Sequence, residues 1–177
     1  MSVGGERYIG QFADGGRGGT GICEYVNGDV YEGEWLMGER CGQGTCAYIV
    51  GAMSPALTKK QRRAAAASRS SSPAPLEMRL TVPPTHPADV LADAKSAGTK
   101  VDVYTGGWQA DVHDGLGQLT YHHGEVYEGE WRAGKRHGRG MELLESSGEC
   151  YVGEWVDGVR QGAGSLADKA KPSLAPP

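Results

Sequence analysis

The feature that most constrains this chain is a short segment that recurs five times at nearly constant spacing. Each copy opens with tyrosine, has glycine two residues later and closes with tryptophan or phenylalanine. The copies begin at residues 8, 31, 104, 127 and 151, so neighbouring openings lie 23 or 24 residues apart except across one long interval. A G-x-G motif starts seven residues after each closing aromatic residue, and arginine stands five residues after it, with His113 in the third copy. This regularity indicates one structural unit used five times.

Each unit is predicted to form a β-hairpin. In Y-x-G-x-W the tyrosine, glycine and tryptophan alternate with period two and therefore share one face of a strand. Turn residues such as Ala133-Gly134 and Asp157-Gly158 follow and fit a tight hairpin loop. Second turns, at 27–29 and 123–125, lead into the next opening strand. We therefore expect one continuous antiparallel meander of about ten strands, in which each unit contacts only its neighbours.

A two-residue loop is assumed here to set the register of each hairpin. In the fourth unit it places three pairs opposite one another: Trp131 with Arg136, Gly129 with Gly138, and Tyr127 with Gly140. The glycines would then leave room for the rings to lie over bare backbone. The tryptophan and arginine of one unit would form a cation–π pair, and His113 would make a weaker contact with Trp108.

These residues resemble the MORN repeat family, whose unit runs close to Y-x-G-E-W-x-x-G-x-x-x-G-x-G. The resemblance covers five units, about 8–51 and 104–166, with departures in units one, three and five. It implies an all-β fold: an elongated single-layer meander of antiparallel hairpins, or solenoid. It also implies a scaffold without activity of its own, of the kind found in cytoskeletal, ciliary (including radial-spoke-head) and membrane-junction proteins. Such arrays bind partner proteins, self-associate and are implicated in phospholipid binding.

The long interval predicts an insert between two blocks of repeats. The expected organisation is repeats one and two at 8–51, the insert at 52–100, repeats three to five at 101–166, and a flexible tail at 167–177. The insert holds eight basic and three acidic residues, a net charge of +5, which leaves −9 for the rest. Its composition predicts a helix from 54 or 55 to 67, a disordered Ser/Pro linker at 68–84 and a second helix at 87–97 that Gly98 ends. A wholly solvated loop is the alternative.

Several functions are not expected. The net charge of −4 gives no overall basic field for nucleic acid, and no stretch is apolar and long enough for a membrane-spanning helix. The G-x-G-x-x-G at 16–21 precedes a strand-like segment, whereas a dinucleotide site needs a helix there. Three of the four histidines His113, His122, His123 and His137 lie in predicted turns or at loop edges, and no metal-ligand spacing repeats among them. No nucleophile–base pair is apparent either, so we expect no cofactor, no metal and no enzyme. Cys23 and Cys46 share one repeat position two strands apart, about 9–10 Å, too far for a disulfide.

The aromatic stripe is the best candidate for a binding surface. A single sheet has no second layer, so we expect the stripe to be only partly covered and to bind partner proteins. Its residues are Tyr31, Trp35, Tyr104, Trp108, Tyr127, Trp131, Tyr151 and Trp155. Glutamates such as Glu34 and Glu130 are expected on the opposite face as a solvated surface. Open edge strands offer sites for dimerisation or strand addition.

The expected role is that of a scaffold or adaptor in a cytoskeletal or ciliary axonemal assembly of the radial-spoke type. A membrane-tethering module, or a regulatory subunit for an enzyme in another chain, are the alternatives. For an acidic partner or anionic lipid, the candidate residues are Lys59, Lys60, Arg62 and Arg63 in the insert.

Overall fold

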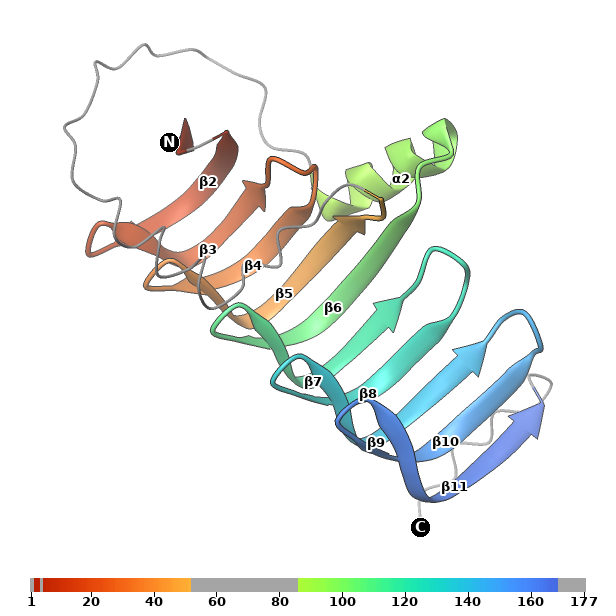
Figure 1. Ribbon diagram of the computed structural model, residues 1–177. Helices are drawn as coiled ribbons and strands as arrows, with labels where there is room; N and C mark the ends of the chain where they lie inside the picture. The colour runs from red at the N-terminus through yellow and green to blue at the C-terminus, as the bar shows by residue number, and fades with distance from the viewer. Residues whose placement is uncertain (1, 4, 52–85, 169–177) are drawn as a thin grey trace.

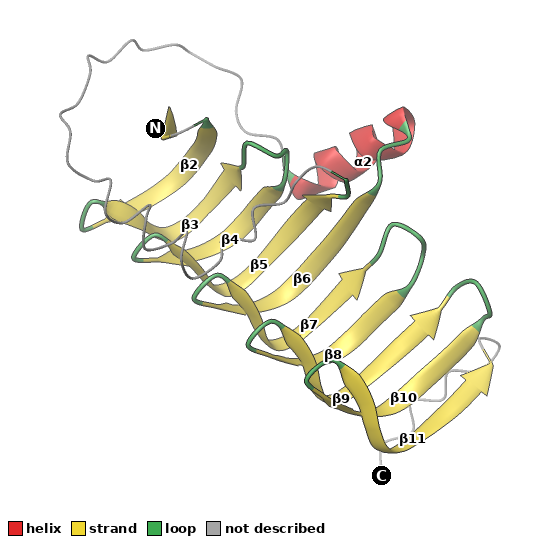
Figure 2. Ribbon diagram, in the orientation of Figure 1, coloured by secondary structure: helices red, strands yellow, loops and turns green. Residues whose placement is uncertain are grey.

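The strands form one antiparallel sheet in which spatial order follows sequence order. The computed structural model describes residues 2–3, 5–51 and 86–168. Its strands are β1 (Ser2–Val3), β2 (Glu6–Ala13), β3 (Gly16–Glu24), β4 (Val30–Leu36), β5 (Glu39–Ile49), β6 (Val101–Gln109), β7 (Val112–Thr120), β8 (Val126–Arg132), β9 (Lys135–Leu144), β10 (Glu149–Val156) and β11 (Val159–Asp168). They succeed one another along an elongated, strongly twisted single layer (Figures 1 and 2). The predicted all-β meander is confirmed.

The five hairpin turns have two residues each, as assumed. Their first residues have φ between 48° and 51° and their second residues between 67° and 91°, which defines type I′ turns. Turns of this type match the right-handed twist of the flanking strands. In four of them the second residue donates its N–H to a carbonyl of the preceding hairpin, for example Gly134 to His113 O at 2.8 Å. The hairpin tips are thereby bonded into a row.

The predicted register is correct at the turn and wrong beyond it. Trp131 pairs with Arg136, but a β-bulge after Gly129 shifts the partners by two residues, so Gly129 faces Gly140 and not Gly138. Tyr127 accordingly pairs with Glu142. Gly138 has a φ of 57° in the bulge, a left-handed conformation that strongly favours glycine. The first glycine of each G-x-G therefore forms the bulge.

The helix α2 (Pro87–Ala97) precedes β6 and lies against the sheet. Its bounds match the predicted second helix, with proline in the first turn and Gly98 following its end. Val90 and Leu91 pack against a small cluster that includes Ala47 and Val101, on the face of the sheet opposite the tyrosines. Figure 1 shows α2 behind the upper end of β5 and β6. The predicted first helix at 54–67 and the linker at 68–84 lie outside the described residues.

The core of the protein is a row of side chains on one face of the sheet, called here the aromatic face. It holds the opening tyrosines, the tryptophans, Cys23, Cys46 and Leu119, with Tyr25, Tyr48 and Tyr121 packed beside them. Strand alternation puts their sequence neighbours on the opposite face. Among the described residues, no helix has the length and apolar character needed to cross a membrane.

Candidate interaction face

The rings of the aromatic face form one unbroken edge-to-face row. Tyrosine and tryptophan alternate along it, because the three middle tyrosines each touch the tryptophan of their own unit and that of the next. At the ends of the row, Tyr8 touches Phe12 and Trp35, and Tyr151 touches Trp155. Centroid distances run from 5.1 to 5.6 Å and interplanar angles from 79° to 89°, the favoured T-shaped arrangement. The row is, in order, Tyr8, Trp35, Tyr31, Trp108, Tyr104, Trp131, Tyr127, Trp155 and Tyr151. The contacts between units therefore repeat those within units.

The polar atoms of these rings are satisfied by backbone carbonyls. Each tyrosine hydroxyl donates to the carbonyl three residues later, as Tyr127 does to Glu130 O at 3.0 Å. Each tryptophan Nε1–H donates across the strand boundary to the second glycine of the preceding G-x-G, as Trp131 does to Gly117 O at 3.1 Å. Gly140 must be glycine because a Cβ there would lie 2.5 Å from the Tyr127 hydroxyl oxygen. Ring and bare backbone are in direct contact.

A layer of guanidinium groups lies over the rings. In the fifth unit Arg160 lies 6.0 Å from the ring centroid of its own Trp155, as predicted, but the other arginines of the layer lie over the tryptophan of the next unit. Arg136 was expected over Trp131 and instead lies 4.9 Å from the Tyr127 centroid and 5.2 Å from that of Trp155 in the next unit. Arg40 likewise lies over Trp108, at 4.3 Å. The arginine side chain is long enough to reach beyond its backbone partner to the following strand. These cation–π contacts therefore join successive units.

The aromatic stripe is far less accessible than the sequence suggested. The eight tyrosine and tryptophan residues proposed for partner binding are between 0 and 8% exposed, so the expectation of a partly uncovered stripe is wrong. The strongly twisted sheet, the edge-to-face stacking and the arginine layer bury the rings without a second sheet. That these eight residues bind a partner stays a prediction. A partner on this face would mainly contact the side chains that lie over the rings. Among the described residues, the large apolar side chains of the aromatic face that are clearly exposed lie at the two ends of the row: Phe12 at 52% and Leu166 at 65%.

His113 replaces arginine in the third unit and gives a neutral version of the same contact. Its ring stacks on Tyr104 at 3.6 Å between centroids and touches Trp108 edge-on at 4.6 Å. The Nε2 atom lies 2.9 Å from the hydroxyl of Tyr48. Burial, helped by the positive charge of Arg40, lowers the pKa of His113 to about 3. The imidazole is thus uncharged at neutral pH, and the predicted contact with Trp108 is confirmed.

A buried carboxylate in the fourth unit was missed by the sequence reasoning. Glu142 is 5% exposed and accepts hydrogen bonds from both Arg136 and Arg160, which belong to successive units. Arg136 also donates to Glu125 at 2.8 Å and to the Tyr121 hydroxyl at 2.9 Å. The corresponding positions in units one to three hold Cys23, Cys46 and Leu119. The sequence did contain a signal for this buried carboxylate, because Glu142 is a charged residue at a repeat position that is apolar in those units.

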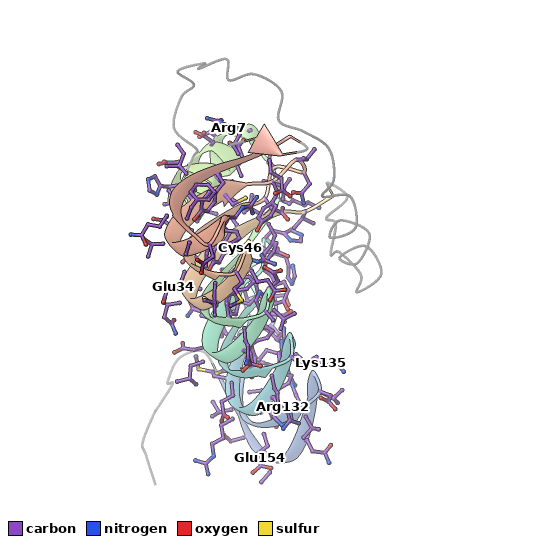
Figure 3. All side chains as sticks on the ribbon, turned by 90° about the vertical axis from the view of Figure 1, so that its left-hand side faces the viewer. Arg7, Glu34, Cys46, Arg132, Lys135 and Glu154 are labelled. Carbon is purple, nitrogen blue, oxygen red and sulfur yellow. The ribbon has the colours of Figure 1, made fainter. Side chains whose placement is uncertain are left out.

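The glutamates before the tryptophans have a structural role that was not predicted. Glu34 was assigned to a solvated surface, but its Oε1 accepts the N–H of Gln43, inside the G-x-G bulge, at 2.7 Å. Glu130 accepts from Arg139 N at 2.9 Å in the same way, and Gln11 takes this role in unit one. Figure 3 shows Glu34 projecting from the side of the ribbon. These side chains satisfy a backbone donor that the bulge leaves without a ladder partner.

The remaining candidates that the structure describes do not come together as a chemical site. Cys23 and Cys46 are free thiols that flank Tyr31 from either side, as predicted, and burial raises the pKa of Cys23 to about 11. The G-x-G-x-x-G segment forms part of β3, not a strand-to-helix turn. Within 2–3, 5–51 and 86–168, no three metal-ligating side chains come together. The basic residues Lys59, Lys60, Arg62 and Arg63 lie outside the described residues.

Comparison with known proteins agrees with this geometry. The MORN repeat model matches residues 8–30, 31–53, 104–125, 127–148 and 151–168, together more than half of the chain. The chain therefore belongs to the MORN repeat family. MORN repeats are found in scaffold or membrane-binding proteins and are generally not catalytic. A search of curated proteins finds no match.

Proposed function

We propose that this protein is a non-enzymatic scaffold that binds partner proteins along its aromatic face and at its edge strands. The observation that carries the proposal is the continuity of that face, which runs from β2 to β11 with one repeated set of side chains. An extended or helical segment of a partner can lie along such a row and meet similar chemistry at every unit. Family membership supports a scaffold role.

The surface offered to a partner is the guanidinium layer and its tyrosine margin. The side chains of Arg17, Arg40 and Arg136 are 14 to 22% exposed, and each is paired with a carboxylate of its own or a neighbouring unit. The face is therefore polar but nearly charge-balanced, and a partner needs apolar contacts for affinity. Phe12 and Leu166 provide such contacts at the two ends of the row.

We place this scaffold in a cytoskeletal complex, with a ciliary or flagellar axonemal complex of the radial-spoke type as the specific proposal. The support is the family resemblance alone. The competing proposals are a membrane tether through Lys59–Lys60 and Arg62–Arg63, and a regulatory subunit for an enzyme in another chain. Binding at the edge strands can also take the form of self-association, in which two copies of the array pair with each other.

The test is extraction of the tagged protein from its own cells with mild detergent, followed by identification of what co-purifies. Retention in the detergent-resistant pellet with defined partners is the expected result. The variant Phe12→Ser/Leu166→Ser should lose those partners, while Leu36→Ser should keep them, because Leu36 is 61% exposed on the opposite face. Release with the membrane fraction would contradict the cytoskeletal role, and retention of every partner by the double variant would contradict the binding face.

A further inference from the structure

The face opposite the aromatic row carries a docking surface for a helix, and α2 occupies it. Val90 and Leu91 of α2 pack against Ala47, Val101 and neighbouring apolar side chains. Just before the helix, His86 Nδ1 lies 2.9 Å from Glu32 Oε2. Under α2 the sheet is closely covered, since Val30 is 1% and Ala47 0% exposed. The elements of this surface are an apolar ladder across three strands and a carboxylate beside it.

The repeat builds the same surface a second time, two units further along. Ala47 pairs with Val30 on one side and Val103 on the other. Two units on, Leu143 pairs with Val126 and Cys150 in the corresponding positions. Glu128 stands where Glu32 does, two residues after the equivalent valine. Ladder geometry and carboxylate are both reproduced on β8, β9 and β10.

Two of the three ladder positions are more accessible in the second surface than in the first. Val126 and Leu143 are half-buried and Glu128 is exposed, in contrast to the covered Val30 and Ala47. The third position, Cys150, is 4% exposed, so the accessible part lies over β8 and β9. The ladder is continuous between the two surfaces, because Val103 pairs with Thr120 and Thr120 with Val126. At the junction lies a cavity of about 470 Å³ lined by Leu91, Val103, Thr120 and His122 among others. The row of paired residues covered by α2 therefore extends past the helix to β8.

We propose that Val126, Leu143 and Glu128 form a docking site for a short amphipathic helix of a partner protein. The helix would resemble α2, with two adjacent aliphatic residues facing the ladder and a basic residue at its N-terminal end facing Glu128. The surface under α2 holds an amphipathic helix, so we expect the same class of ligand at the second surface. The exposed carboxylate of Glu128 favours a ligand with a positive charge at that position. This site is on the face opposite the proposed scaffold surface and is independent of it.

A labelled peptide of residues 86–98 is the probe, because that sequence binds the equivalent surface within the chain. Added to the full-length protein, it lacks the high effective concentration that linkage gives α2. We therefore expect weak binding, with a Kd on the order of 0.1–1 mM. NMR chemical-shift changes should centre on Val126, Leu143 and Glu128. Changes centred on Ala47 and Val101 would show exchange with α2 itself and overturn the proposal, as would absence of binding.

Two variants and one control complete the test. Leu143→Asp should weaken peptide binding at least tenfold. Glu128→Lys, at an exposed position whose carboxylate accepts a 3.4 Å hydrogen bond from Gln118, should weaken it several-fold. Ile9→Asp is the matched control, since Ile9 is 54% exposed on the same face in unit one. Equal binding by Glu128→Lys and the native protein would overturn the assigned polarity of the helix. A dimer in sedimentation that Leu143→Asp abolishes would assign the surface to a second copy and also overturn the proposal.

Discussion

Arg40 and Asp111 are joined by a salt bridge although 71 residues separate them in the sequence. The guanidinium Nε lies 3.2 Å from the carboxylate Oδ1, and the backbone N–H of Arg40 donates to the same oxygen at 2.9 Å. The two residues stand in successive units, in strand β5 and in the turn between β6 and β7. The sheet therefore continues across the insert as if units two and three were adjacent in the sequence.

Deletion of the insert should consequently leave the sheet folded. Removing 52–85 and linking residue 51 to His86 by a short Gly/Ser segment should change the free energy of unfolding little, because β5 and β6 pair directly. Removing 52–100 in favour of a short turn should cost roughly 2 kcal/mol, since Ala47 and Val101 lose the cover of Val90 and Leu91. Urea unfolding of both deletions measures this. Global unfolding of either would show that the insert belongs to the core.

Gly140→Ala should destabilise the protein by about 2 kcal/mol or more. The added Cβ would lie 2.5 Å from the Tyr127 hydroxyl oxygen, and the ring is held between two tryptophans. Arg139→Ala is the control, one residue away and exposed, and should stay within about 0.5 kcal/mol. Thermal and urea unfolding compare the two, and equal stability would contradict the direct ring-to-backbone contact.

Glu142→Gln should cost about 3 kcal/mol, because Arg160 then faces a neutral acceptor in a buried position and Arg136 keeps Glu125 as its charged partner. The exposed Glu128→Gln provides the comparison and should have little effect on unfolding. If Glu142→Gln lowers the free energy of unfolding no more than Glu128→Gln does, solvent already satisfies the two guanidinium groups.

The protein should lose stability as pH falls below about 6.5, in part through His113. Its pKa of about 3 in the folded chain lies below the ordinary 6.5, so between these values the unfolded chain binds a proton that the folded chain does not. The contribution is fully present above pH 6.5 and falls by about 1.4 kcal/mol per pH unit toward pH 3. His113→Gln removes it. Urea unfolding at several pH values should give a shallower slope for the variant, and parallel curves would refute the assignment.

Met37→Asn should stabilise the protein by about 1 kcal/mol. Met37 is the first turn residue of β4–β5, with a φ of 51° and 87% exposure, and asparagine tolerates that conformation better. Leu36→Asn, at an extended and exposed position, should bring no gain. The melting temperatures of both variants test this, and an unchanged value for Met37→Asn would argue against a type I′ turn.

The sequence predicted the fold and the two faces but not the register within a hairpin. The bulge shifts pairing by two residues, so Gly129 lies on the same face whether it is opposite Gly138 or Gly140. Because the side-chain period is also two, the pattern of aromatic residues satisfies both registers. The left-handed φ of Gly138 separates them, and that depends on backbone geometry, not on residue type alone.

The composition of the candidate face was predictable, while its contacts and burial were not. The spacing of tyrosine, tryptophan and arginine gives the set of side chains, but the reach of Arg136 to Trp155 depends on how adjacent strands are offset. The same offset lets each tryptophan bond to the preceding glycine carbonyl, which closes the row. Glu142 departs from the repeat visibly in the sequence, yet its partner Arg160 comes from the next unit.

The order of strands along the layer has a mechanical consequence. In an antiparallel meander the backbone hydrogen bonds are perpendicular to the strands and so run along the long axis of the array. Tension applied between β2 and β11 therefore loads one strand pair at a time, as in opening a zipper, instead of shearing many bonds together. The array should extend at low force in steps of one hairpin and refold unit by unit when released, which makes it a compliant link and not a stiff strut.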